Sequence, residues 1–181
     1  MRRVFIQILA VPLLAVPLLC ALPLHAQRER DPLTPQEADQ VADLRDQPNQ
    51  RIKLFEKFIQ QRIDAIKAIG PDPQEMDLKA ELRAKYQEFT QLSDELQDNL
   101  DTFDDAHADM RKALKDLVAA AAKWPPILKE AAPDRTYDFS RETALDSAQS
   151  TNEQVKQLYE SQVKYFKIHK HESGTNGTGP S

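Results

Sequence analysis

Residues 98–109, DNLDTFDDAHAD, hold five aspartates and one histidine within twelve positions. Carboxylate and imidazole groups are common metal ligands, so metal binding is the first chemistry to consider. An EF-hand needs oxygen ligands around a turn glycine, and this stretch has no glycine. A di-iron bundle needs two Glu-x-x-His pairs, and Asp104-Asp105-Ala106-His107 supplies one imperfect copy. We therefore predict no metal site here and expect the aspartates to form the solvated flank of a helix.

The other side chains that could do chemistry are few. His169 and His171 form a His-x-His pair in a polar segment near the C-terminus, where we interpret it as incidental. Only His107 lies on a firm predicted element, and no serine matches it for nucleophilic catalysis. Cys20 is the only cysteine and Gly70 the only glycine before residue 174, which excludes thiolate chemistry in the mature chain and Gly-rich phosphate loops. We predict a protein that is not an enzyme and has no catalytic, metal or cofactor residues.

The N-terminal segment 1–26 has the order of a secretory signal peptide. Arg2 and Arg3 precede an apolar stretch over 4–24, and cleavage is expected after Ala26. An uncleaved membrane anchor is the alternative, although three prolines within the segment disfavour a spanning helix. We therefore expect a periplasmic or secreted protein.

Charge limits the partners of the mature chain. Removing segment 1–26 takes away two basic residues, which leaves 22 basic and 29 acidic side chains and a net charge of −7. Nucleic acid and anionic membrane surfaces would repel such a chain, so neither is an expected partner. A membrane would be involved only if the N-terminal segment is retained.

Prolines and capping residues divide the rest of the chain into helices. Thr34-Pro35-Gln36-Glu37 is a capping box, and Asp72-Pro73-Gln74-Glu75 repeats its pattern. Gly70 and Pro71 are typical of a helix end. We predict a single helical domain over 27–168, a flexible tail over 169–181 and an extended connector over 125–140, with Ser140 capping the last helix. The predicted helices are 35–46, 49–69, 73–124 and 141–168.

The longest of these helices carries large apolar residues at heptad spacing. The pattern predicts one central helix of about 78 Å at 1.5 Å per residue, with the shorter helices antiparallel along it. The fold class is all-α, an elongated helical hairpin or bundle. A break near Asp98–Asp105, which would give a compact four-helix bundle, is the alternative. The residues of this predicted interaction stripe are Phe89, Leu96, Phe103, Met110, Leu117 and Trp124.

One short motif resembles a known family. Leu33-Thr34-Pro35-Gln36-Glu37 resembles the LTxxQ motif of small periplasmic helical chaperones and metal-stress sensors, and the resemblance covers five residues. The family has glutamine at the position of Glu37 and usually repeats the motif, which occurs once here. The resemblance implies chaperone or metal-stress-sensor activity, and we keep this as the alternative function.

The preferred function is that of a non-enzymatic scaffold or adaptor that acts through protein-protein contacts. The polar sequence QSTNEQ in the last helix leaves the middle of the central stripe thinly covered. We therefore predict that the chain forms a homodimer along an antiparallel seam. The seam residues would be Phe89, Leu96, Phe103 and Met110. The sequence does not identify a protein partner.

Overall fold

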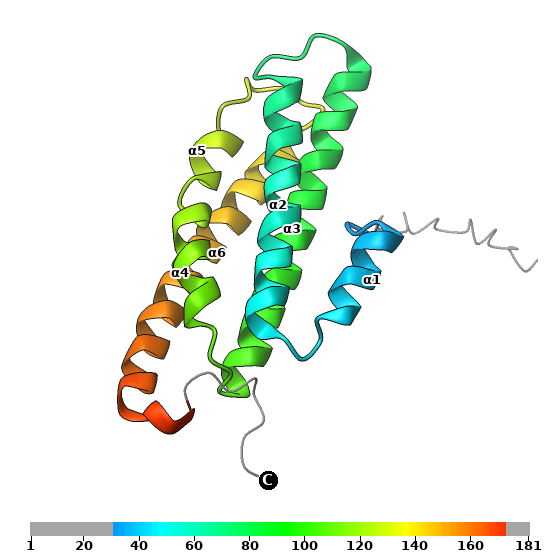
Figure 1. Ribbon diagram of the computed structural model, residues 1–181. Helices are drawn as coiled ribbons and strands as arrows, with labels where there is room; N and C mark the ends of the chain where they lie inside the picture. Colours follow the sequence, from blue (N-terminus) through cyan, green and yellow to red (C-terminus); the bar gives the residue numbers. More distant parts are fainter. Residues whose placement is uncertain (1–30, 173–181) are drawn as a thin grey trace, which may run out of the picture. The chain divides into compact units, whose positions relative to one another are not determined.

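The computed structural model describes residues 31–172, which form an all-helical bundle without a strand in that range (Figure 1). This confirms the predicted fold class. The predicted signal segment 1–26 and tail residues 173–181 lie outside the described residues. The α-helices are α1 (Pro35–Asp43), α2 (Pro48–Ile69), α3 (Met76–Asp105), α4 (Arg111–Ala121), α5 (Trp124–Leu128) and α6 (Asp138–Ile168), and a 3₁₀ turn, η1, spans Lys170–Glu172.

The boundaries of α1 and α2 follow the local sequence signals. The Glu37 amide donates to Thr34 Oγ1 over 3.2 Å, and the Thr34 amide donates to Glu37 Oε2 over 2.8 Å. This reciprocal pair is the predicted capping box. Gly70 ends α2 with a φ of 88°, a conformation that glycine adopts at little cost. Both predictions are confirmed.

The prediction of a single central helix over 73–124 is wrong. α3 ends at Asp105, and residues 106–110, hereafter the α3–α4 turn, reverse the chain before α4 begins. α4 is antiparallel to α3, and α3 alone is about 45 Å long at 1.5 Å per residue. The break lies just beyond the range that the compact-bundle alternative proposed.

Three other expectations about helix ends are also corrected. Asp72 does not cap α3, since the helix begins after Glu75 and no side chain caps it. Trp124 does not stop a long helix; it opens α5, because prolines fit the first turn, where no amide is needed. α6 begins at Asp138, so Ser140 lies inside it and is buried.

Four helices form the bundle, with consecutive α3 and α4 on a diagonal. α2 packs against α3 and α4, and α6 packs against the same two helices. α6 runs parallel to α3, since Ser147 bonds Asp94 and Gln154 bonds Asp101. In Figure 1, α6 accordingly starts near the upper part of α3 and descends past α4.

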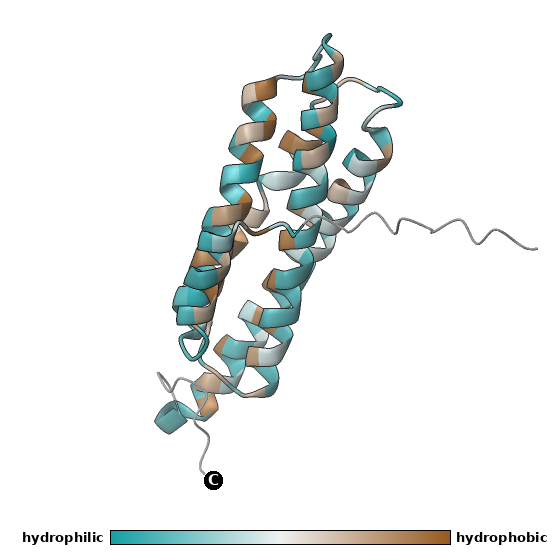
Figure 2. Ribbon diagram, turned by 90° about the vertical axis from the view of Figure 1, so that its right-hand side faces the viewer, coloured by the Kyte–Doolittle hydropathy of each residue, from teal (hydrophilic) through white to brown (hydrophobic). Residues whose placement is uncertain are grey.

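The core lies where these four helices and α5 meet. Along each ribbon, apolar residues alternate with polar ones at helical spacing (Figure 2). Burial raises the pKa of Tyr86 to about 12, and its hydroxyl donates to the Leu128 carbonyl over 3.3 Å. The largest fully buried aliphatic side chains are Ile52, Ile59, Ile63, Leu82, Leu92, Leu96 and Leu100.

A buried arginine attaches α1 to this bundle. The guanidinium of Arg62 donates to both carboxylate oxygens of Glu37, over 2.7 and 2.9 Å, and to Glu88 Oε2 over 3.1 Å. It also donates to the Pro32 carbonyl over 2.7 Å. The hydrogen bond from Arg62 is the main reason that the pKa of Glu37 falls from 4.5 to about 2. α1 is thus tied to α2 and α3 by a charged group with bidentate geometry.

Candidate functional site

The predicted interaction stripe belongs to the interior of one chain. Five of its residues are buried, with Phe89 packed edge-on against Trp124 at 5.8 Å between ring centroids. Phe103 alone is partly buried, at the edge of the core. A side chain buried within one chain presents no surface to a second copy, so Phe89, Leu96 and Met110 are not available for the predicted dimer seam. The homodimer itself stays a prediction. The buried stripe residues are Phe89, Leu96, Met110, Leu117 and Trp124.

The heptad spacing misled because burial continues across the α3–α4 turn. Met110 and Leu117 belong to the same buried core as Leu96. The chain reverses between Leu96 and Met110. An antiparallel helix pair can keep an apolar period that matches one longer helix. The turn itself is the feature that apolar spacing does not reveal.

The α3–α4 turn closes α3 with a Schellman motif. The His107 amide donates to the Asp104 carbonyl, and the Ala108 amide donates to the Phe103 carbonyl, each over 2.9 Å. His107 has a φ of 53°, the left-handed conformation that this motif needs and that glycine usually supplies. A non-glycine residue adopts it at some cost. Other contacts must therefore hold the turn.

Two amide side chains from neighbouring helices provide those contacts. Gln162 on α6 donates to the Ala108 carbonyl over 2.9 Å and accepts from the Met110 amide over 2.9 Å. Asn49 on α2 donates to the Asp109 carbonyl over 2.6 Å and accepts from the Ala113 amide over 2.9 Å. Two amides at the start of α4, those of Met110 and Ala113, have no partner within the helix and are thus satisfied by side chains of α6 and α2.

Most of the aspartates of 98–109 are exposed, and two of the five also accept hydrogen bonds from α6. Asp101 Oδ1 accepts from Gln154 over 2.7 Å, and Asp104 Oδ1 accepts from Gln162 over 3.1 Å. The expected solvated flank is therefore confirmed for Asp98, Asp101 and Asp105, and only Asp104 and Asp109 depart from it, because they are partly buried. The polar middle of α6, which was expected to cover the core thinly, is matched by polar groups of α3. No group of three or more His, Cys, Asp or Glu side chains within 31–172 is arranged to hold a metal ion.

An acidic surface remains on α3 despite these contacts. Asp94, Asp98, Asp101 and Asp105 follow one another at helical spacing and are all exposed, and we call them the acidic flank. Residues 94–109 include seven acids and no Lys or Arg. Carboxylates this concentrated produce a negative potential along one side of the bundle.

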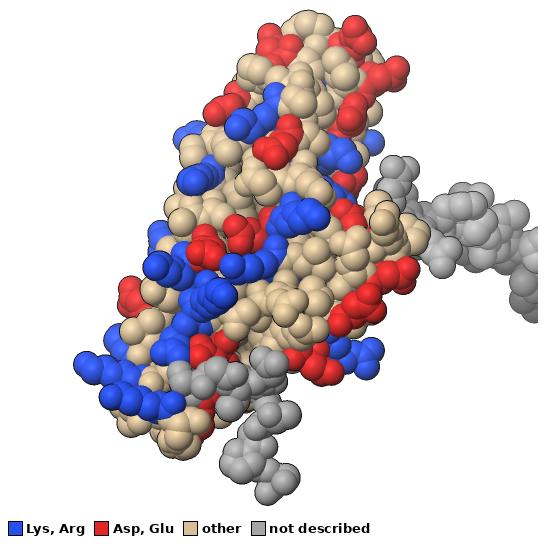
Figure 3. Space-filling view, in the orientation of Figure 1, with Lys and Arg blue, Asp and Glu red and all other residues tan. Residues whose placement is uncertain are grey.

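The charge changes sign immediately after the turn. Arg111, Lys112 and Lys115 open α4, and Lys and Arg gather over α4 and the lower part of α6 in Figure 3. Arg111 is held in place by Asp109, through bonds of 2.8 and 2.7 Å, and it lies 4.7 Å from the ring centroid of Phe166. The hydrogen bond that Arg111 donates to Asp109 is the main cause that raises the pKa of Arg111. Its guanidinium is therefore a fixed positive charge.

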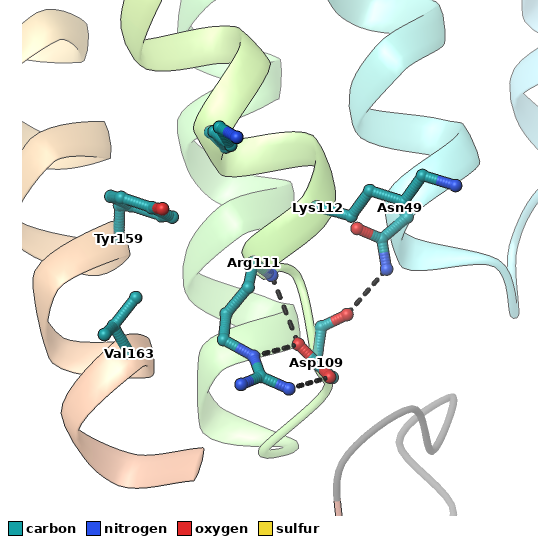
Figure 4. A pocket seen from close by; sticks show the side chains of 7 residues that line it. Asn49, Asp109, Arg111, Lys112, Tyr159 and Val163 are labelled. Carbon is teal, nitrogen blue, oxygen red and sulfur yellow. Dashed lines mark hydrogen bonds and ion pairs between the residues drawn. The ribbon is translucent and has the colours of Figure 1, made fainter. Parts of the chain in front are cut away.

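These cations line an open groove with a volume of about 500 Å³. α4 forms its floor, Asn49 comes from α2, and Tyr159 and Val163 reach toward it from α6 (Figure 4). We call this surface the cationic groove. Its residues are Asn49, Asp109, Arg111, Lys112, Lys115, Tyr159 and Val163.

The histidines meet at the same end of the bundle. The ring of Tyr165 stacks on His107 at 5.2 Å and on His169 at 4.1 Å between centroids. The Tyr165 hydroxyl donates to Glu172 over 2.7 Å, which is the main cause of the lowered pKa of Glu172, and His171 lies 3.0 Å from that carboxylate. Residues 169–172, predicted as the start of the tail, thus form a defined turn.

Comparison of the chain with models of protein families, with curated proteins and with solved structures finds no match. The helices described between residues 31 and 172 are not long and apolar enough for any of them to cross a membrane. The site is therefore argued from its chemistry alone. Its arrangement suits the binding of negatively charged groups, because the fixed Arg111 guanidinium and the exposed ammonium groups of Lys112 and Lys115 line one accessible surface. Sequence reasoning missed these cations, although the change from acids to Arg111, Lys112 and Lys115 was a visible signal.

Proposed function

We propose that the protein is a non-enzymatic adaptor or scaffold that works outside the cytoplasm through contacts with another protein. The observation that carries the proposal is the charge separation between the acidic flank on α3 and the cationic groove on α4. Both surfaces belong to helices whose backbones are fixed in one bundle. Complementary charges steer protein association and set its specificity.

The way the helices hold these charged side chains in place supports the binding of a partner rather than catalysis. The cations project from a regular helix, and the turn beside them is held by Asn49 and Gln162. Such a surface is preorganised, so a partner pays little entropy to order it. Secretion, expected from segment 1–26, places the partner in the same extracytoplasmic compartment.

The test is crosslinking in the native host followed by mass spectrometry of the adducts. The proposal expects the mature chain, beginning at Gln27, in discrete adducts with a different protein at reproducible stoichiometry. A chain recovered only as monomer would contradict it. So would suppression of aggregation of many unfolded proteins at near-stoichiometric amounts, which would instead support the chaperone alternative.

A further inference from the structure

The cationic groove contains donors that the fold does not use. Within residues 31–172, neither Lys112 nor Lys115 forms an ion pair, although both are exposed beside the groove. The nearest acid on α4, Asp116, is bound to Lys53 over 2.8 Å. No hydrogen bond from the Tyr159 hydroxyl occurs in the same range.

The lining combines these donors with apolar surface. Val163 is 43% exposed in the groove, and the half-buried ring of Tyr159 lies beside it. An aromatic ring next to exposed methyl groups favours contact with side chains as well as with charges. Asp109 is occupied by Arg111, so the net charge of the lining is positive.

The open shape of the groove favours some classes of ligand over others. A site for a small anion is usually enclosed and surrounds most of its ligand. This groove instead lies across the outer face of α4 and is open to solvent between Asn49 on α2 and Val163 on α6 (Figure 4). A flat anionic membrane would meet the acids of the mature chain, whose expected net charge is −7, as well as its lysines.

From this geometry we infer that the cationic groove binds an extended, carboxylate-rich segment of a partner protein. Acidic side chains of the segment pair with Lys112 and Lys115, and an apolar side chain between them rests on Val163 and Tyr159. The inference rests on the proposed function and adds the chemistry of the partner. Exposed ion pairs contribute little singly, so the apolar contact and several charges must act together.

The test measures binding of a fluorescein-labelled peptide of about ten residues in which glutamates alternate with apolar residues. The mature protein purified from its host is compared with Lys112→Glu/Lys115→Glu and with the matched control Lys67→Glu/Lys129→Glu. The control changes the net charge equally, at exposed lysines outside the groove. Circular dichroism checks that both variants fold.

The expected result is saturable binding that falls about tenfold or more in the groove variant and changes less than about twofold in the control. Binding should weaken as salt rises, and the peptide with glutamine in place of glutamate should not bind. Tyr159→Phe should weaken binding by a smaller factor. Equal loss in both charge variants, or no binding of the glutamate peptide, would overturn the inference.

Other occupants give distinct results, each of which overturns the inference. Inorganic phosphate that binds where the peptide does not would indicate a small-anion site. Binding only to phosphatidylglycerol vesicles would indicate a membrane surface, and self-association lost in the groove variant would indicate a second copy of the chain. If host adducts persist unchanged in the groove variant, the adaptor stands and the groove assignment fails. If the peptide binds but the host yields no adducts, the proposed function fails instead.

Discussion

α3 contacts its two neighbours in different ways. Toward α2 it packs large aliphatic and aromatic side chains, with Ile59 and Leu92 fully buried. Toward α6 it meets small residues such as Ala148 and, along the edge, a series of polar pairs, among them Gln154 with Asp101. The buried side chains of α2 are mostly large and apolar, whereas those of α6 include small and polar residues whose pairs with α3 fix direction and register. One helix can therefore contribute stability on one face and specificity on another.

The first way to test this comparison is to remove one group from each interface. Ile59→Ala should destabilise the protein by about 2–5 kcal/mol, because it leaves a cavity in the α2–α3 core. Gln154→Ala should cost below about 1 kcal/mol, since its bond to Asp101 is exposed. Urea unfolding followed by circular dichroism measures both. Equal costs would show that the two interfaces contribute alike.

On the α6 side, one polar contact should contribute far more to the stability of the protein than the bond between Gln154 and Asp101. Gln162 is 3% exposed and bonds the Ala108 carbonyl and the Met110 amide of the α3–α4 turn. Gln162→Leu keeps the volume similar but leaves both groups buried without partners, at a cost of about 2–3 kcal/mol. Hydrogen exchange should quicken first at the amides of the turn. An effect as small as that of Gln154→Ala would contradict its role.

On the α2 side, the stabilising effect of the bond between Arg62 and Glu37 should depend on pH. Because the pKa of Glu37 is lowered from 4.5 to about 2, its stabilising effect is fully present above pH 4.5 and is lost as pH falls toward 2. Glu37→Gln should cost about 2 kcal/mol at neutral pH and remove this part of the acid dependence. Hydrogen exchange of α1 amides between pH 5 and 3, corrected for intrinsic rates, measures it. An unchanged acid dependence would show that Glu37 is not responsible.

The last expected effect is a gain in the stability of the protein. His107 holds a left-handed conformation, so His107→Gly should stabilise the turn by about 1 kcal/mol, less whatever its stacking on Tyr165 contributes. His107→Ala loses the stacking and keeps the strain, so it should destabilise the protein. Thermal unfolding of the two variants separates the effect of the backbone strain from that of the stacking on Tyr165. A glycine variant less stable than the alanine variant would contradict the strain.

Features that depend on local sequence could be predicted, whereas features that depend on contacts between distant parts of the chain could not. The Thr34 capping box, the end of α2 at Gly70 and the all-helical fold follow from local chemistry and from apolar periodicity. The α3–α4 turn does not, because it depends on Asn49 and Gln162, which come from distant parts of the chain. Burial of the predicted stripe likewise depends on how four helices enclose it. The cationic groove combines residues from three helices, of which only the α4 cluster is visible in the sequence.

The reversal of the chain at residues 106–110 is the central claim, because it creates both the buried stripe and the groove. Spin labels at Gln87 on α3 and Ala119 on α4, both exposed, measure it by pulsed electron spin resonance. The antiparallel arrangement predicts a distance below about 30 Å, since α3 and α4 run in opposite directions across one bundle and the two positions are separated along its axis by much less than the length of α3. A continuous helix would place them about 48 Å apart at 1.5 Å per residue. A distance distribution centred near that longer value would contradict the account.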